Sequence, residues 1–208
     1  MKKVLITGGC GYIGSHTIVD LIENNYACIS VDNYLNSDPS VLNSIHEITG
    51  VKVENYPIDI TQKEELEQIF EDTEIDAVIH FAALKAVGES VDKPLLYYKN
   101  NIGGMMNLME CCIKYKVKHF IFSSSCTVYG QAEKLPVTEN TPLQQAESPY
   151  GYSKQVCERI ITDTIIQKPI NSAILRYFNP AGAHDSNQLG ESPINPPLNL
   201  VPVITETA

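Results

Sequence analysis

Tyr150 and Lys154 are the pair of residues in this sequence best suited to transferring a proton. They follow Pro149 at the start of an amphipathic stretch, and helical residues four positions apart share a face, whereas Tyr152 would point away from Lys154. A free tyrosine titrates near pH ~10, so half-ionisation near pH ~7 requires a pKa lower by about 3 units, or roughly 4 kcal/mol. One ammonium about 4 Å away at an effective dielectric constant of about 20 supplies approximately that. The spacing therefore predicts Tyr150 as a general base assisted by Lys154.

The chemistry of this pair depends on what lies beside it. In isolation, a tyrosine and a lysine at the start of a helix form an ordinary structural pair. Beside an oxidised nicotinamide, whose positive charge would favour the tyrosinate further, the tyrosine would remove the proton of a secondary alcohol while the hydride leaves for the cofactor. Ser125, at the end of an apolar run, would hydrogen-bond that hydroxyl, although serines at strand ends ordinarily form turns. A dinucleotide site elsewhere in the chain would decide between these interpretations.

Three glycines, Gly8, Gly11 and Gly14, predict such a site. They connect a short β-prone run at residues 3–7 to a stretch with helical spacing at residues 15–25. Glycines here let the backbone turn sharply, approach a ligand and pack the helix on the strand, so that the helix N–H groups face an anion. A glycine pattern alone is weak evidence, because turns are rich in glycine. The natural anion would be a pyrophosphate.

Asp32 ends the next apolar run, residues 27–31, and strengthens this interpretation. A carboxylate there can accept hydrogen bonds from both hydroxyls of an adenosine ribose, and it would repel a 2′-phosphate. The alternative is a turn aspartate at a strand end. The glycine turn at the expected distance upstream favours the binding role, with NAD as the cofactor rather than NADP.

Strands and helices alternate along the rest of the chain. Further strands are expected at residues 51–56, at 75–83 and at 119–122, the last running into Ser123, Ser124 and Ser125. Helices are expected over 41–45, from a capping box of Thr61 and Glu64, over 94–116, and from Tyr150 onward. Gly103 and Gly104 would weaken the 94–116 helix by roughly 1 kcal/mol each unless close packing requires them. The pattern predicts an α/β fold with a doubly wound, parallel, Rossmann-like sheet.

Ligands of such a sheet bind beyond the carboxyl ends of its strands, which directs attention to the residues there. The small side chains of Ala82 and Ala83 would leave room for a cofactor, and Lys85 would lie on the ligand side. Asp59 could hydrogen-bond the adenine amino group, or it could simply lie near a helix N-terminus.

Composition limits the classes of protein to consider. The chain has 208 residues, 43% of them hydrophobic, enough for one sizeable core or one core and part of another. A net charge of −10 with only 15 Lys and Arg argues against a nucleic-acid surface. No apolar run is long enough for a bilayer or a secretory leader, so no membrane association and a cytoplasmic location are expected.

Cysteine and histidine spacing predicts no metal site. The six cysteines form no C-x-x-C pair, and the five histidines are dispersed without a zinc-binding spacing. Reduced, mostly buried thiols are expected instead.

Four segments carry a resemblance to a known family: residues 8–17, 78–90, 123–130 and 175–180. They resemble the extended short-chain dehydrogenase/reductases, and most specifically their UDP-glucose (UDP-galactose) 4-epimerase group. The first and third segments are similar across many nucleotide-sugar enzymes, whereas the second and fourth are more specific. The resemblance covers essentially the whole chain.

The resemblance implies an activity and a set of site residues. It implies that Tyr150 deprotonates the C4 hydroxyl of a UDP-sugar, that NAD takes the hydride, and that the 4-keto sugar turns over and receives the hydride on its other face. Because NAD is regenerated in each cycle, it should be held tightly. The residues matching the family's catalytic set are Ser125, Tyr150 and Lys154. Those expected at NAD are Gly8, Gly11, Tyr12, Ile13, Gly14, Asp32, Asn33, Asn36, Ser37, Asp59, Ile60, Phe81, Ala82, Ala83, Lys85, Asn100, Tyr150, Lys154 and Phe178. Those expected at the substrate are Lys85, Ser125, Tyr150, Asn179 and Asn199.

Two features leave alternatives open. Related 4,6-dehydratases carry an Asp-Glu pair, and UDP-glucuronate decarboxylases a Glu, where this chain has Cys126 and Thr127, which weakens both alternatives. The family's substrate segment usually has two consecutive asparagines, of which only Asn199 is kept, and family chains extend well beyond residue 208.

The expected organisation is an NAD-binding domain at 1–178 and the start of a truncated substrate domain at 179–208. The chain is then an epimerase or an NAD-binding fragment that cannot turn over. A homodimer through helices near 100–116 and 153–168 is expected, although an unfinished domain could instead expose apolar surface and aggregate.

Overall fold

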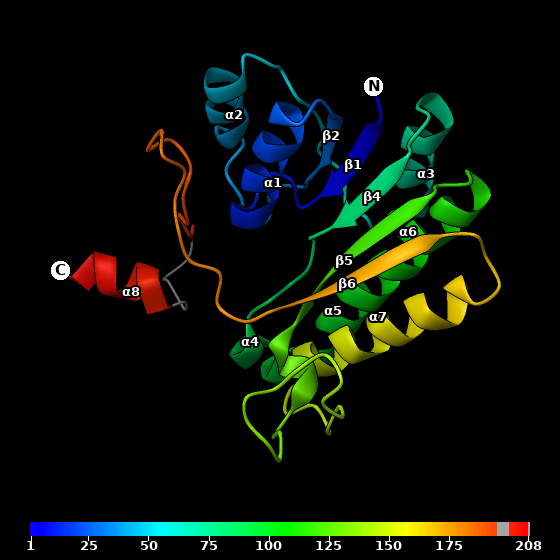
Figure 1. Cartoon of the computed structure of the whole chain (residues 1–208), viewed down its shortest axis with the longest axis vertical. Coiled ribbons are helices and arrows are strands. Elements are labelled where there is room, and N and C mark those ends of the chain that lie inside the picture. Colours follow the sequence, from blue (N-terminus) through cyan, green and yellow to red (C-terminus); the bar gives the residue numbers. More distant parts are fainter. Residues whose placement is uncertain (195–199, 208) are drawn as a thin grey trace.

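The computed structural model describes residues 1–194 and 200–207, which form a parallel sheet covered by helices on both faces (Figure 1). The strands are β1 (Lys3–Thr7), β2 (Ala27–Val31), β3 (Glu54–Tyr56), β4 (Ala77–His80), β5 (His119–Ser125) and β6 (Asn171–Tyr177). They lie in the order β3-β2-β1-β4-β5-β6, and every pairing is parallel. The predicted doubly wound, Rossmann-like sheet is confirmed.

The helices alternate with these strands. They are α1 (Tyr12–Glu23), α2 (Val41–Thr49), α3 (Lys63–Asp72), α4 (Val87–Asp92), α5 (Pro94–Tyr97), α6 (Gly104–Lys114), α7 (Pro149–Ile165) and α8 (Leu200–Thr207). A π-helical turn, η1 (Tyr98–Gly103), joins α5 to α6, and a 3₁₀ turn, η2 (Cys126–Tyr129), follows β5.

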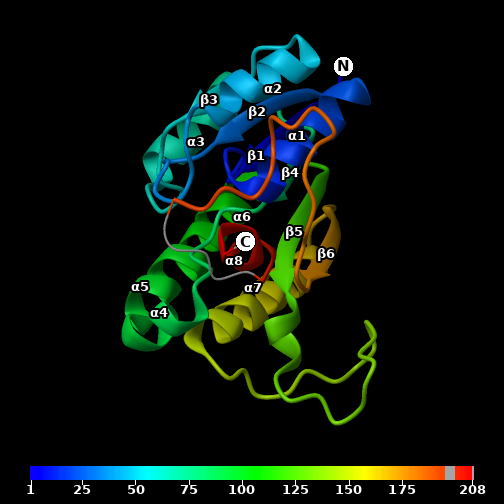
Figure 2. The same cartoon turned by 90° about the vertical axis from the view of Figure 1, so that its left-hand side faces the viewer.

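Two apolar clusters hold the layers together. On one face, α3, α6 and α7 pack on the sheet through residues such as Leu66, Leu108 and Ile161, all fully buried. On the other face, α1 and α2 contribute Ile18 and Ile45 to a smaller cluster. Figure 2 shows the chain after a turn of 90°, with the loop between η2 and α7 projecting away from the rest of the structure.

Several predicted boundaries were wrong. The third strand is confined to Glu54–Tyr56, because the exposed Val51 and Lys52 lie outside the sheet. The fourth ends at His80, since Phe81 and Ala82 both turn their N–H groups to the Thr7 carbonyl. The edge strand β6 was not predicted, because its apolar residues are interrupted by polar ones.

The predicted capping box is also absent. The N-cap of α3 is Gln62 and makes no side-chain capping bond, whereas the Asp59 carboxylate accepts the Thr61 N–H at 2.8 Å. The 94–116 helix is divided by the π-helical turn η1. Gly104 is required there, because a Cβ atom would lie 2.5 Å from Ile60 Cδ1, whereas a Cβ on Gly103 would meet nothing within 4 Å.

No helix in the described ranges has the length and apolar character needed to cross a bilayer. Within those ranges, no three His, Cys, Asp or Glu side chains gather as a metal site requires. All six cysteines are free thiols, and Cys10, Cys111, Cys112 and Cys157 are buried.

Candidate active site

The carboxyl ends of β1, β2, β4 and β5 lie along one edge of the sheet. Register pairs Thr7 with Val31 on one side and with His80 on the other. The chain reverses its winding between β1 and β4, and in open α/β sheets the ligand crevice lies at that reversal. The glycine turn after β1 and the serines at the end of β5 therefore lie on either side of the expected crevice.

The glycine turn is built as the sequence predicts. Gly8 has a φ of +71°, and a Cβ atom there would lie 2.7 Å from the backbone nitrogen of Ala82. A Cβ on Gly14 would lie 2.2 Å from the Gly8 carbonyl oxygen, so this glycine lets α1 pack against the turn. The N-cap, Gly11, makes no side-chain capping bond, so the first N–H groups of α1 have no side-chain partner there. Gly9, which the sequence analysis did not single out, is also required, because a Cβ would meet the Ser30 hydroxyl.

Asp32 is held by donors from both sides of the turn. Its Oδ2 accepts the Cys10 N–H at 3.0 Å, and its Oδ1 accepts the Tyr34 N–H at 3.0 Å and the Ser37 hydroxyl at 2.7 Å. A carboxylate offers about four acceptor positions, so at least one remains for a ligand hydroxyl. The structure thus links the strand-end aspartate to the glycine turn through Cys10.

The segment after β6 crosses the glycine turn. Figure 1 shows it in orange, running from the sheet edge past α1. The Tyr12 hydroxyl donates to the Gly182 carbonyl at 2.7 Å, and Lys85 Nζ lies 4.0 Å from Glu191 Oε1. Leu189 is 4% exposed and joins the cluster formed by α1 and α2. Two residues predicted at the cofactor, Tyr12 and Lys85, therefore contact this segment.

Tyr150, Lys154 and Ser125 come together at the other side of the crevice. Ser148 caps α7 by accepting the Gly151 N–H at 3.1 Å, and Pro149 occupies the first turn, which places Tyr150 at the helix start. Lys154 lies on the same face, with Nζ 5.8 Å from the centroid of the Tyr150 ring, while Tyr152 is exposed, as expected. Lys154 Nζ donates to the Ser123 carbonyl at 2.8 Å.

The pKa values of Tyr150 and Lys154 are both shifted by burial. Burial raises the pKa of Tyr150, and a hydrogen bond with Ser125 partly opposes that rise. Burial also lowers the pKa of Lys154 to about 8. The expectation that the ammonium lowers the Tyr150 pKa assumed a separation of about 4 Å at an effective dielectric constant of about 20, with no cost of burying the phenolate. It was wrong for this structure, because the ammonium is directed to the Ser123 carbonyl and desolvation dominates at Tyr150.

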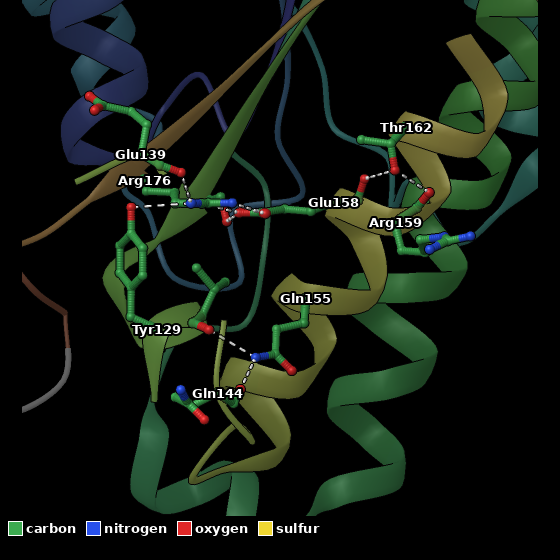
Figure 3. A network of polar contacts seen from close by, with 10 residues as sticks. Tyr129, Glu139, Gln144, Gln155, Glu158, Arg159, Thr162 and Arg176 are labelled. Carbon is green, nitrogen blue, oxygen red and sulfur yellow. Dashed lines mark hydrogen bonds and ion pairs between the residues drawn. The ribbon is translucent and has the colours of Figure 1, made fainter. Parts of the chain in front are cut away.

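A buried polar network behind this cluster was not predicted (Figure 3). Arg176 on β6 donates to both carboxylate oxygens of Glu158, from Nε at 3.0 Å and from Nη2 at 2.8 Å. The Ser124 hydroxyl donates to Glu158 Oε1 at 2.5 Å, and Arg176 Nη1 donates to the Tyr129 hydroxyl at 3.1 Å. Glu158 lies four residues after Lys154, and this helical spacing was the sequence signal that could have placed it on the same face of α7. The network joins β5, β6 and α7.

Asn101 is a second residue that the sequence analysis missed. Its side chain is buried, accepts the Leu84 N–H at 2.9 Å, and donates to the Leu84 carbonyl and the Ser153 hydroxyl, each at 3.0 Å. It thereby joins the loop after β4 to α7. An asparagine inside a helical stretch was the available sequence signal. The neighbouring Asn100, which was predicted, donates to Asn101 Oδ1 at 2.9 Å.

The remaining predicted residues are distributed along the same edge. Ile60 is buried against Gly104, and Phe81 packs against the α1–α2 cluster. Asn33, Asn36 and Asn179 are exposed. Phe178 is 59% exposed and stacks on Tyr129, with ring centroids 6.4 Å apart. Ile13, Ala82 and Ala83 are half-buried, and Asn199 lies outside the described residues.

The family follows from the sequence match. The family model described as "NAD dependent epimerase/dehydratase family" matches residues 4–195. The chain belongs to this family.

Several relatives that resemble the chain are UDP-glucose 4-epimerases. The UDP-glucose 4-epimerase of Schizosaccharomyces pombe is 50% identical over 210 residues, which cover 99% of this chain and 59% of that protein. That of Bacillus subtilis is 48% identical over 206 residues, covering 99% and 60%. The crystal structure of UDP-glucose 4-epimerase from Bifidobacterium longum in complex with NAD⁺ and UDP has a TM-score of 0.96 at 47% identity, covering 99% of this chain and 62% of that one. The chain thus spans about 60% of the length of these relatives.

Proposed function

We propose that this chain is the NAD-binding part of a UDP-glucose 4-epimerase, which interconverts UDP-glucose and UDP-galactose at C4 through a transient 4-keto sugar. The observation that carries the proposal is the placement of Tyr150, Ser125 and Lys154 beside the carboxyl end of β5, at the edge of the sheet where the strand order reverses and a ligand is expected. The relatives described above support it, since they carry this name at 46% identity or more.

The residues present fit a dinucleotide. The turn at Gly8–Gly14 presents the start of α1 without a side-chain cap, which suits a pyrophosphate. Asp32 keeps acceptor capacity for ribose hydroxyls, and its charge disfavours a 2′-phosphate. The residues proposed to line NAD are those named in the sequence analysis, from Gly8 to Phe178. When bound, NAD supplies the acceptor and donor of the hydride.

The chain's own residues handle the proton. Tyr150 takes the proton of the C4 hydroxyl, and Ser125 donates a hydrogen bond to the oxygens involved. Lys154 supplies positive charge beneath the tyrosine and is fixed by the Ser123 carbonyl. Lys85, Asn179 and Asn199 are proposed to contact the UDP-sugar.

A dehydratase or decarboxylase is the competing function within this family. Those reactions need a carboxylate after the β5 serines, and η2 supplies Cys126 and Thr127 there. Neither a thiol nor an alcohol supplies the carboxylic acid/base pair that those reactions use. We therefore favour epimerisation.

The proposed organisation places NAD on residues 1–178 and the start of the substrate-binding region at 179–208. Tyr12 and Lys85 support a functional link between the two, because both contact residues 182–191. The unpaired thiols support a reducing, cytoplasmic setting.

We also propose that the protein is a homodimer. Leu95, Leu96, Met106 and Tyr152 are exposed by 80%, 46%, 48% and 52%, and they come from α5, α6 and α7. Apolar side chains gathered on neighbouring helices are typical of a protein interface. Sedimentation of the wild type and of Met106→Glu would show a dimer and its weakening.

The function is tested by turnover of UDP-galactose by the purified protein, with NAD quantified after denaturation and Tyr150→Phe as the control. Epimerisation that disappears in Tyr150→Phe supports the proposal. Bound NAD with no turnover in either protein identifies an NAD-binding fragment instead, and elimination of water from the sugar would identify a dehydratase.

A further inference from the structure

Thr127 contacts the hydroxyl of Ser125 in a way that limits what Ser125 can do. Its own hydroxyl donates to Ser125 Oγ at 3.0 Å, and its backbone N–H donates to the same oxygen at 3.3 Å. A serine hydroxyl has two acceptor lone pairs and one proton to donate. Both lone pairs of Ser125 are therefore occupied, and only its proton remains for other partners.

The remaining Ser125 hydroxyl proton is available to the Tyr150 side chain. Ser125 is 7% exposed at the end of β5, and its hydrogen bond with Tyr150 favours the phenolate, which lowers the Tyr150 pKa against the effect of burial. A donated proton stabilises a phenolate, whereas an accepted one would not.

We propose that Thr127 is a positioning residue, which fixes Ser125 as a hydrogen-bond donor whose single proton goes to Tyr150 or, once substrate is bound, to the alcohol oxygen that Tyr150 activates. In this arrangement Ser125 does not relay the substrate proton, because it has no lone pair left to receive it, and Tyr150 takes the proton directly. The identity of the alcohol rests on the function proposed above, but the orientation of the Ser125 hydroxyl does not.

The packing of α7 keeps Thr127 in place. A Cβ atom on Gly151 would lie 3.3 Å from the Thr127 carbonyl oxygen and 3.4 Å from its Oγ1, so the first turn of α7 rests on this threonine. Since Gly151 follows Tyr150 directly, Thr127 contacts both Ser125 and the turn that carries the tyrosine. A carboxylate at position 127 could only accept, and it would draw the Ser125 proton away from Tyr150.

The other groups around Tyr150 come from three elements. Lys154 lies on α7 itself, the Cys126 thiol faces Tyr150 from η2, and Tyr97 faces it from α5, with its hydroxyl bonded to Glu89 at 2.9 Å. A change at Thr127 alters none of these side chains, so its effect on Tyr150 passes through Ser125.

The test is the titration of Tyr150 in Thr127→Val, which keeps the shape of the side chain and removes the hydroxyl, and in Thr127→Ser, which keeps it. The chain has 11 tyrosines, so the tyrosinate absorbance of each protein is measured with NAD present and corrected by the same protein carrying Tyr150→Phe. Thr164→Val is the matched control, because Thr164 donates only to the Ile160 carbonyl of its own helix in the described contacts.

Thr127→Val should raise the Tyr150 pKa by about 0.5 to 1 unit, which is about a three- to tenfold loss of tyrosinate near neutral pH. Thr127→Ser and Thr164→Val should leave it unchanged, and kcat should fall in parallel with the tyrosinate fraction while KM stays constant. An unchanged Tyr150 pKa in a folded, NAD-binding Thr127→Val protein would overturn the proposal even if the protein epimerises. A raised pKa in a protein without turnover would support it and count against the proposed function alone.

Discussion

Arg176 donates two hydrogen bonds to the Glu158 carboxylate, from Nε to Oε1 at 3.0 Å and from Nη2 to Oε2 at 2.8 Å. This ion pair joins the edge strand β6 to α7. The side chains are 21% and 8% exposed. Ser124, between the Ser123 carbonyl that holds Lys154 and the predicted catalytic Ser125, donates to the same carboxylate. The pair therefore fixes the positions of β5 and α7 relative to each other directly behind the candidate active site.

Arg176→Met should reduce the free energy of unfolding by about 3 kcal/mol, because it leaves the buried Glu158 carboxylate without its positively charged partner. Arg176→Lys should lose less unfolding free energy than Arg176→Met but should remain less stable than the wild type, because an ammonium cannot form two parallel hydrogen bonds. Urea unfolding measures both. The matched control is Arg159→Met, whose exposed pair with Asp163 should contribute little; equal losses in the two methionine variants would contradict a special role for Arg176.

Lys154→Met should make the protein more stable while removing its activity. Burial lowers the Lys154 pKa from 10.5 to about 8, so the folded state carries a penalty for the charged form at neutral pH. The shift of about 2.5 units corresponds to about 3 kcal/mol, offset in part by the lost bond to Ser123, which leaves an expected gain of about 2 kcal/mol.

The stability difference between Lys154→Met and the wild type should depend on pH. Between pH 8 and 10.5 the folded wild type loses the Lys154 proton while the unfolded chain keeps it, so wild-type stability rises relative to the variant. The advantage of Lys154→Met should shrink across that range. A variant that is less stable than wild type at every pH would refute the argument.

His80 should make the protein sensitive to acid. The ring is 2% exposed, its Nδ1 lies 2.6 Å from the Thr7 hydroxyl, and burial followed by the Lys154 charge lowers its pKa to about 3. Below the unfolded pKa of about 6.5, the unfolded chain binds a proton that the folded chain does not, so stability falls by about 1.4 kcal/mol per pH unit from this group.

His80→Gln should therefore flatten the dependence of unfolding free energy on pH between about pH 6 and about pH 4, whatever its stability at neutral pH. The slope, obtained from urea unfolding at several pH values, is the quantity to compare. Parallel slopes for the wild type and His80→Gln would show that His80 is not held neutral.

Gly14→Ala should weaken NAD binding, whereas Gly103→Ala should leave NAD binding intact and increase stability. A Cβ on Gly14 would lie 2.2 Å from the Gly8 carbonyl, so the turn must move and NAD binding should weaken by tenfold or more, on the order of 1.4 kcal/mol. A Cβ on Gly103 meets nothing within 4 Å, and alanine there should stabilise the protein by up to about 1 kcal/mol. Calorimetric NAD binding and thermal unfolding measure the two effects, and equal NAD affinity in both variants would argue against the turn as the pyrophosphate site.

The sequence by itself determined the parts of this protein that depend on local pattern. The run from Lys3 to Thr7, the glycines after it and Asp32 predicted a dinucleotide turn, and the alternation of strands and helices along the chain predicted the parallel α/β sheet. The i, i+4 spacing placed Tyr150 and Lys154 on one face of a helix, because that spacing is set by helix geometry alone.

Only the tertiary structure decided how those residues are tuned. The Lys154 ammonium is directed to the Ser123 carbonyl, and the Arg176–Glu158 pair spans 18 residues between a helix and an edge strand that the sequence pattern did not reveal. The direction of the Tyr150 pKa follows from burial by several elements at once. Desolvation and long-range hydrogen bonds depend on which distant segments pack together, and no local spacing in the chain encodes that.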